Sequence, residues 1–125
     1  MDLLLPISIL EREIHPLRGR FSLSTVIKSA KKVSKGLGIS LPGAPQGAKF
    51  IKTKITSSQG AGRILFLVKL EESYLLPLLL RSKNDKVGFN MSPQNILFLR
   101  QVRKNLDLAM EDIAAGDFEL VGLNS

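Results

Sequence analysis

Cysteine and tryptophan are absent from this 125-residue chain, and histidine occurs only once, as His15. Without cysteine the chain has no disulfide and no thiolate nucleophile, which is typical of proteins in a reducing cytosol. A single histidine excludes a catalytic histidine pair and argues against a histidine-ligated metal. We therefore expect a protein that uses neither a metal nor a cofactor.

Long hydrophobic runs are also missing. The runs "ILFLV" and "YLLPLLL" are far shorter than the roughly 20 apolar residues of a membrane-spanning helix, and Lys69, Glu71 and Glu72 separate them. The opening "MDLLLPISIL" has no basic region and no small-residue cleavage site, so it does not read as a signal peptide. The sequence predicts a cytoplasmic protein without membrane contact.

Acidic residues are absent from residues 14–70, which hold eleven lysines and arginines. Residues 105–125 show the reverse, with five acids and no base, although the net charge of the chain is +7. This asymmetry favours a basic working surface whose partner is a nucleic acid, with salt-dependent binding through phosphate contacts. The alternative is a generally basic surface that only maintains solubility.

The length is that of one domain, residues 1–125. Residues 7–14 alternate in polarity and suit either a strand or a helical turn. A helix follows, capped by Ser22 or Ser24 and ended by Gly36 or Gly38. Its apolar residues recur at helical spacing: Val26, Ile27, Ala30, Val33 and Leu37.

Three strands are expected at residues 48–56, 63–70 and 74–82. Their connections are too short for parallel crossovers, so the pattern predicts an antiparallel meander. Ser92 and Pro93 are expected to open a helix, with a second helical stretch that ends at Gly116 and a last strand or tail at 117–123. The predicted buried stripe of the helix is Ile96, Leu99, Val102 and Leu106.

Cations gather along the first two predicted strands, where residues 49–70 contain Lys49, Lys52, Lys54, Arg63 and Lys69 and no acid. Alternate residues of a strand share a face, so Lys52 and Lys54 lie on one side of the sheet. If the register is as expected, one sheet surface gathers five cations. These are Lys52, Lys54, Arg63, Arg81 and Lys83.

Such a cluster suits cleavage of RNA by its own 2′-hydroxyl group. The reaction needs a group that accepts the 2′ proton, one that protonates the 5′ oxygen, and positive charge near phosphorus. Lysine serves in proton transfer where neighbouring cations disfavour its protonated form, and arginine stabilises developing negative charge. Arg63 also follows a Gly-x-Gly turn that would admit a phosphate closely. The alternative is that the cations bind phosphate without cleaving RNA.

Four segments in order resemble the RelE-type toxins of bacterial type II toxin-antitoxin systems, and most closely the HigB-like subgroup of the RelE/ParE superfamily. They are "FIKTKIT", "GAGRILFLVKL", "RSKNDKVGFNMS" and "AAGDFELVGL", and the resemblance covers about residues 21–121. It implies an α+β fold in which N-terminal helices pack on a small twisted antiparallel sheet, followed by a C-terminal helix.

The resemblance also implies a function. Family members with ribonuclease activity cut mRNA without metal, commonly on the ribosome, and are held inactive by a cognate antitoxin. Lys52 and Lys54 match the family's second-strand lysines, Arg63 the third-strand arginine, and Arg81 or Lys83 the next cation. The chain departs from the family where a tyrosine, or a histidine with acids, is usual, because only Phe89, Asn90 and the acidic tail occupy those regions, and the general base stays unassigned.

The leading hypothesis is therefore a toxin that acts as a metal-independent mRNA endoribonuclease. The alternatives are a non-catalytic protein that binds RNA or the ribosome, and a ParE-like inhibitor of DNA gyrase on the same fold. Further lysines are predicted to bind RNA around the catalytic cluster. These are Lys28, Lys31, Lys32, Lys35, Lys49, Lys69 and Lys86.

Overall fold

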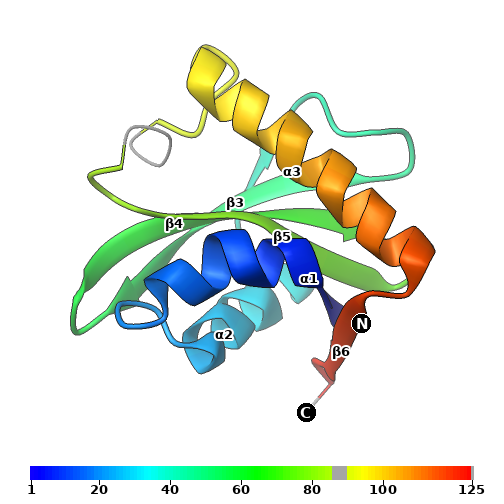
Figure 1. Cartoon of the computed structure of the whole chain (residues 1–125), viewed down its shortest axis with the longest axis horizontal. Coiled ribbons are helices and arrows are strands. Elements are labelled where there is room, and N and C mark those ends of the chain that lie inside the picture. The colour runs from blue at the N-terminus through cyan, green and yellow to red at the C-terminus, as the bar shows by residue number, and fades with distance from the viewer. Residues whose placement is uncertain (86–89, 125) are drawn as a thin grey trace.

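A computed structural model describes residues 1–85 and 90–124 of the chain and has the predicted α+β class (Figure 1). Six strands form one mixed sheet in the order β2-β3-β4-β5-β1-β6. Their bounds are β1 (Asp2–Pro6), β2 (Ile39–Leu41), β3 (Lys49–Ser57), β4 (Gly60–Lys69), β5 (Tyr74–Ser82) and β6 (Phe118–Gly122).

Helices cover both faces of this sheet. Figure 1 shows α3 (Ile96–Ala115) above the sheet and α2 (Leu23–Ser34) below it. A third helical region begins directly after β1 and consists of α1 (Ile7–Ile9), η1 (Leu10–Ile14) and η2 (His15–Leu17). The predicted C-terminal helix is therefore present, and residues 7–14, which suited either a strand or a helical turn, are helical.

The meander of β3, β4 and β5 confirms the three predicted strands and their antiparallel pairing. The strand ends differ from the prediction by at most three residues. The largest difference is at β4, which begins at Gly60, directly after a two-residue turn. The short strand β2 was not predicted. It pairs antiparallel with β3, where Ile39 lies opposite Lys52.

The prediction of a wholly antiparallel sheet was wrong at one pairing, because the sheet is mixed. β1 inserts between β5 and β6 and runs parallel to β5, with Asp2 opposite Tyr74 and Leu3 opposite Leu75. The pairing with β6 is antiparallel and runs the length of both strands. The driving force is the burial of three consecutive leucines, Leu3, Leu4 and Leu5, each at most 4% exposed.

Helix α2 begins as predicted, because the Ser22 hydroxyl accepts the backbone N–H of Thr25 at 3.3 Å. Val26, Ala30 and Val33 are buried against the sheet. Leu37 was expected in the same stripe but is 58% exposed, since the helix ends before it.

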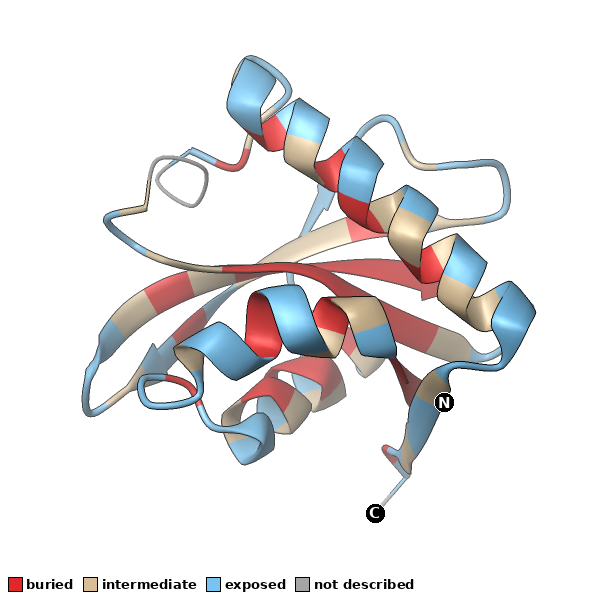
Figure 2. Cartoon of the chain, in the orientation of Figure 1, coloured by how far each residue is buried: buried red, intermediate tan, exposed pale blue. Residues whose placement is uncertain are grey.

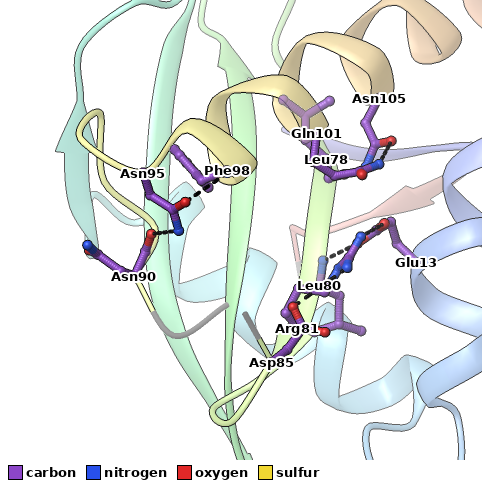
Figure 3. Close-up of polar contacts among 10 residues, drawn as sticks. All are labelled: Glu13, Leu78, Leu80, Arg81, Asp85, Asn90, Asn95, Phe98, Gln101 and Asn105. Atoms are coloured by element: carbon purple, nitrogen blue, oxygen red, sulfur yellow. Dashed lines mark hydrogen bonds and ion pairs between the residues drawn. The ribbon is translucent and has the colours of Figure 1, made fainter. Parts of the chain in front are cut away.

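Helix α3 begins at Ile96 rather than at Ser92 and Pro93, so the predicted start was wrong. Asn95 is the cap: its Oδ1 accepts the backbone N–H groups of Leu97 and Phe98 at 3.1 and 3.4 Å. Its Nδ2 donates to the carbonyl of Asn90 at 2.8 Å, which fixes the preceding turn (Figure 3). Because the Asn95 amide both caps the helix and closes the preceding turn, α3 begins at Ile96.

The buried stripe of α3 also differs from the prediction. The buried residues are Phe98, Val102, Asn105 and Ala109, whereas Ile96 and Leu99 are 62% and 46% exposed. The helix runs unbroken to Ala115 instead of dividing into two, and Gly116 ends it with a left-handed φ of 78°. β6 follows at once, so the first of the two alternatives for residues 117–123, a strand rather than a tail, is the one present.

A bulge in β5 explains why α3 buries a polar residue, Asn105, against the sheet. Leu65 pairs with Leu79 and Phe66 pairs with Pro77, so Leu78 is the extra residue of the bulge. Asn105, fully buried, donates to the carbonyl of Leu78 at 2.7 Å (Figure 3). The amide supplies a partner for a buried carbonyl at the irregularity.

Successive side chains of the central strands point alternately to the two helical layers. Figure 2 shows that the sheet between these layers is largely buried. Ile55, Gly62 and Ile64 share the face covered by α2, and the Phe21 ring packs over Gly62 on that side. The opposite face begins with Phe50, which lines a cavity together with residues of α3. Because α3 covers this second face only partly, residues further along the same strands are left for the functional site.

Candidate nucleic-acid interface

Three cations lie side by side across β3, β4 and β5. Lys54 is directly opposite Arg63 in the β3–β4 ladder, and Arg63 is directly opposite Arg81 in the β4–β5 ladder. Residues paired in this way point to the same face, with Cβ atoms about 4.5–5.5 Å apart. We call Lys54, Arg63 and Arg81 the cationic row. The predicted strand register, which grouped these three residues, is confirmed.

Like charges directly opposite each other destabilise a sheet. Within the described part of the chain, neither Lys54 nor Arg63 has a hydrogen-bond or ion-pair partner. Lys54 is exposed and Arg63 is half-buried. Two of the three charges of the row are therefore uncompensated and accessible.

Arg81 has a different environment, because Glu13 of η1 neutralises it. Glu13 Oε2 lies 2.6 Å from Arg81 Nη2, and Glu13 Oε1 accepts Arg81 Nε–H at 3.0 Å (Figure 3). Asp85 lies 3.7 Å from Nη1. Burial of the guanidinium lowers its pKa, but the hydrogen bond and charge of Glu13 outweigh burial and leave the pKa of Arg81 raised.

Glu13 is 3% exposed, and it was missed by the sequence analysis. β1 pairs with the first residues of β5 and then turns into a helix, which leaves the far part of β5 without that neighbour. The Glu13 carboxylate takes the place of the missing strand at this point, because it accepts the backbone N–H of Leu80 at 2.9 Å. One feature of the sequence does indicate that Glu13 is buried. It comes four residues after Ile9, which is buried, and residues at this spacing share one side of a helix.

The remaining two predicted catalytic residues flank the row. Lys52 lies two residues before Lys54 on the same face, and its Nζ donates to the carbonyl of Met91 at 3.2 Å. Lys83 is exposed and follows β5, where its backbone N–H donates to the carbonyl of Ala61 at 3.0 Å. The five residues predicted to be catalytic therefore lie at neighbouring positions. Two of them, Lys52 and Arg81, already interact with other groups of the protein.

The lysines predicted to bind RNA are more dispersed. Lys28, Lys31, Lys32 and Lys35 belong to α2 or its end, on the sheet face opposite the cationic row. Lys49 is exposed at the start of β3, and Lys69 lies 3.7 Å from Glu72. Lys86 lies outside the described residues, as does Phe89.

A small cavity of about 130 Å³ adjoins the row and is lined by Ile39, Lys52, Thr53, Lys54 and Arg63. Two of the residues that line it, Lys54 and Arg63, belong to the cationic row. Gly62, just before Arg63, does not provide this space. A Cβ there would lie 2.5 Å from the Arg81 carbonyl and 2.8 Å from the Phe21 ring, so the glycine is required by packing.

Neither a metal site nor a membrane-spanning helix is found among the described residues. In residues 1–85 and 90–124, no group of three or more histidine, aspartate or glutamate side chains is placed to hold a metal ion. Over the same residues, no helix is both long and apolar enough to cross a membrane.

No family model, curated protein or solved structure matches the chain. The fold and the site by themselves define the class: an α+β protein with a mixed six-stranded sheet and a cationic row on one sheet face.

Proposed function

We propose that this protein is a toxin of the RelE/HigB type that binds mRNA through the cationic row and cleaves it without a metal ion. The observation that supports the proposal is the direct opposition of Lys54, Arg63 and Arg81 across three strands. Such an arrangement costs stability in the free protein, and a bound polyanion would remove that cost. RNA, whose backbone carries one negative charge per nucleotide, is the polyanion that we propose for this row.

The proposed reaction is the attack of a ribose 2′-oxygen on the adjacent phosphorus. The P–O5′ bond breaks, and the products are a 2′,3′-cyclic phosphate and a free 5′-hydroxyl. Arg63 stabilises the charge that develops on the phosphoryl oxygens, since its side chain has no internal acceptor among the described residues. Lys54, opposite Arg63 and exposed, is assigned to proton transfer. Arg81 positions the phosphate while Glu13 holds its guanidinium.

A second candidate is RNA or ribosome binding without cleavage. Two of the five predicted catalytic cations are engaged by the protein itself, Lys52 by the Met91 carbonyl and Arg81 by Glu13. That leaves two free cations in the row, which are enough for phosphate binding but few for general acid–base catalysis.

One experiment separates these candidates. The purified chain is incubated with ribosomes translating a defined mRNA and, separately, with free mRNA in the presence and absence of EDTA, and the RNA ends are mapped. Cleavage that leaves 2′,3′-cyclic phosphate ends supports the nuclease, and cleavage of free mRNA that persists in EDTA supports its independence of metal. Binding without new RNA ends supports the second candidate, and the absence of both binding and cleavage contradicts the proposal.

A further inference from the structure

A cavity of about 220 Å³ lies between the end of β5 and the helical turns η1 and η2. β5 pairs with β1 only at Tyr74 and Leu75, and among the described residues no strand pairs with the rest of this edge. We call the cavity the β5-edge cavity. Because Arg81 lines it and also belongs to the cationic row, the cavity and the row adjoin. Six of the lining residues are Arg12, Glu13, Pro16, Leu17, Arg81 and Asp85.

The guanidinium of Arg81 is fixed in place but has unused donors. Its Nε and Nη2 donate to Glu13 at 3.0 and 2.6 Å, which uses two of the five N–H groups of an arginine. In the part of the chain that the structure describes, Nη1 forms no hydrogen bond. Asp85 Oδ1 lies 3.7 Å from Nη1, which is too long for a hydrogen bond (Figure 3). A fixed donor and a nearby acceptor thus line one cavity without bonding to each other.

The charges that line the β5-edge cavity are balanced. Arg12 and Arg81 are cations, and Glu13 and Asp85 are acids. The cationic row has uncompensated positive charge instead, so a phosphate is favoured in the row and is opposed by the two carboxylates of the cavity. A metal ion is opposed in the same way by the two guanidinium groups. The ligand that suits the cavity therefore has no net charge and has both hydrogen-bond donors and acceptors.

We propose that the β5-edge cavity binds a base of the RNA held by the cationic row, and that it selects bases with an exocyclic amino group. The proposal rests on RNA binding in the proposed function, but it does not need cleavage. The amino group donates to the Asp85 carboxylate, and the ring nitrogen beside it accepts Arg81 Nη1–H. Asp85 has the capacity for this bond beside its other contacts, because a carboxylate has about four acceptor positions. Hydrogen bonds to base edges are the usual way in which proteins read single-stranded RNA.

Uracil fits this arrangement poorly. It has a carbonyl where cytosine has its amino group, and its ring N–H lies between two carbonyl oxygens, which a carboxylate repels. Pro16 and Leu17, together with the exposed guanidinium of Arg12, offer surfaces on which either ring packs. Selection between bases therefore comes from Asp85 and Arg81, whereas packing contributes to the binding of both pyrimidines.

The test uses the full chain and fluorescently labelled oligonucleotides of about ten nucleotides, a usual site size for single-strand binding. Every ribose is 2′-O-methylated, so no 2′-hydroxyl is present to attack phosphorus. Oligocytidylate, oligouridylate and an abasic backbone of the same length carry the same phosphate charge, and fluorescence anisotropy gives their affinities. We expect oligocytidylate to bind at least about fivefold more tightly than oligouridylate, and the abasic backbone to bind most weakly.

Variants locate the site. Asp85→Ala should reduce the affinity for oligocytidylate to that for oligouridylate, and it should not weaken binding of oligouridylate. Arg12→Ala should weaken both oligonucleotides by a similar factor and keep their ratio. Asp107→Ala on α3 and Arg18→Ala after η2 are the matched controls, since neither residue lines the cavity, and both should keep the preference for cytidylate. Melting is the fold control, and the comparison of the two pyrimidines in the wild type does not depend on any variant.

Three results would overturn this proposal alone. The first is equal affinity of the wild type for oligocytidylate and oligouridylate. The second is a preference for cytidylate that survives in Asp85→Ala, which would place base recognition elsewhere. The third is tighter binding of all three oligonucleotides by Asp85→Ala, because removal of this carboxylate strengthens binding if the cavity holds a phosphate. Absence of binding to every oligonucleotide would instead contradict the proposed function itself, and the base cavity with it.

Discussion

Glu13 Oε2 lies 2.6 Å from Arg81 Nη2, and the other carboxylate oxygen, Oε1, accepts the backbone N–H of Leu80. One buried side chain thus completes the hydrogen bonding of a strand that has lost its neighbour and neutralises one end of the cationic row. The cationic row and the fold are connected through this carboxylate.

Glu13→Gln should destabilise the protein substantially. The substitution leaves the largely buried Arg81 guanidinium with only Asp85, 3.7 Å from Nη1, as a counter-charge, and removal of one partner of a buried pair typically costs about 3–5 kcal/mol. Because the Arg81 side chain is 22% exposed, we expect the lower end of that range. Urea unfolding followed by circular dichroism measures the change. Exposed Glu11→Gln is the control, and equal stability of both variants would show that the pair is unimportant.

Asn105→Leu should also destabilise the fold, by about 1–3 kcal/mol. The leucine fits the apolar surroundings but leaves the carbonyl of Leu78 without a donor, and a buried unsatisfied carbonyl costs that amount. Thermal melting is the measurement. Gln101→Ala, which removes only the partner of the Asn105 oxygen at the half-buried side of the helix, should cost less. A larger loss in Gln101→Ala than in Asn105→Leu would contradict this account of the bulge.

Arg63→Ala and Lys54→Ala should each reduce toxic activity by more than tenfold. Loss of a group that stabilises developing charge typically costs about 2.7–4 kcal/mol of transition-state stabilisation. Neither variant should lose stability, because truncation relieves repulsion between directly opposed cations. Cleavage of mRNA on purified ribosomes measures the activity, with melting as the fold control. Lys28→Ala, on the other sheet face, is the matched control, and full activity in the two row variants would place the site elsewhere.

RNA affinity should fall steeply as salt concentration rises. Each phosphate neutralised on a single strand contributes a slope of about −0.7 in a plot of log affinity against log salt. Lys54→Ala should reduce the slope by about one contact, and Lys28→Ala should leave it unchanged. Filter binding over a salt series gives both slopes. An affinity that does not respond to salt would remove the nucleic-acid interpretation.

Expression of the protein alone in bacteria should slow translation and growth, and co-expression of the product of the adjacent gene should restore both. The reason is the proposed cleavage of mRNA and its control by an antitoxin. Incorporation of labelled amino acid and growth curves are the measurements, with Arg63→Ala as the inactive control. Normal growth at verified expression of folded protein would argue strongly against a toxin.

Much of the cationic row was predictable because it depends on local rules. Alternation along β3 placed Lys52 and Lys54 on one face, and the short turn after Ser57 set Lys54 opposite Arg63. The start of α3 was not predictable from its first capping signal, since Ser92 and Asn95 both suit the position. Asn95 became the cap because its amide also holds the carbonyl of Asn90.

The sequence by itself determined which residues share a face within each strand and helix, and where Gly116 ends α3. Only the tertiary structure decided that β1 runs parallel to β5, that Glu13 reaches Arg81, and that Phe98 rather than Leu99 is buried. The physical reason is that periodicity reflects the geometry of one element. The choice of which face is covered, and by what, depends on contacts between segments as far apart as Glu13 and Arg81.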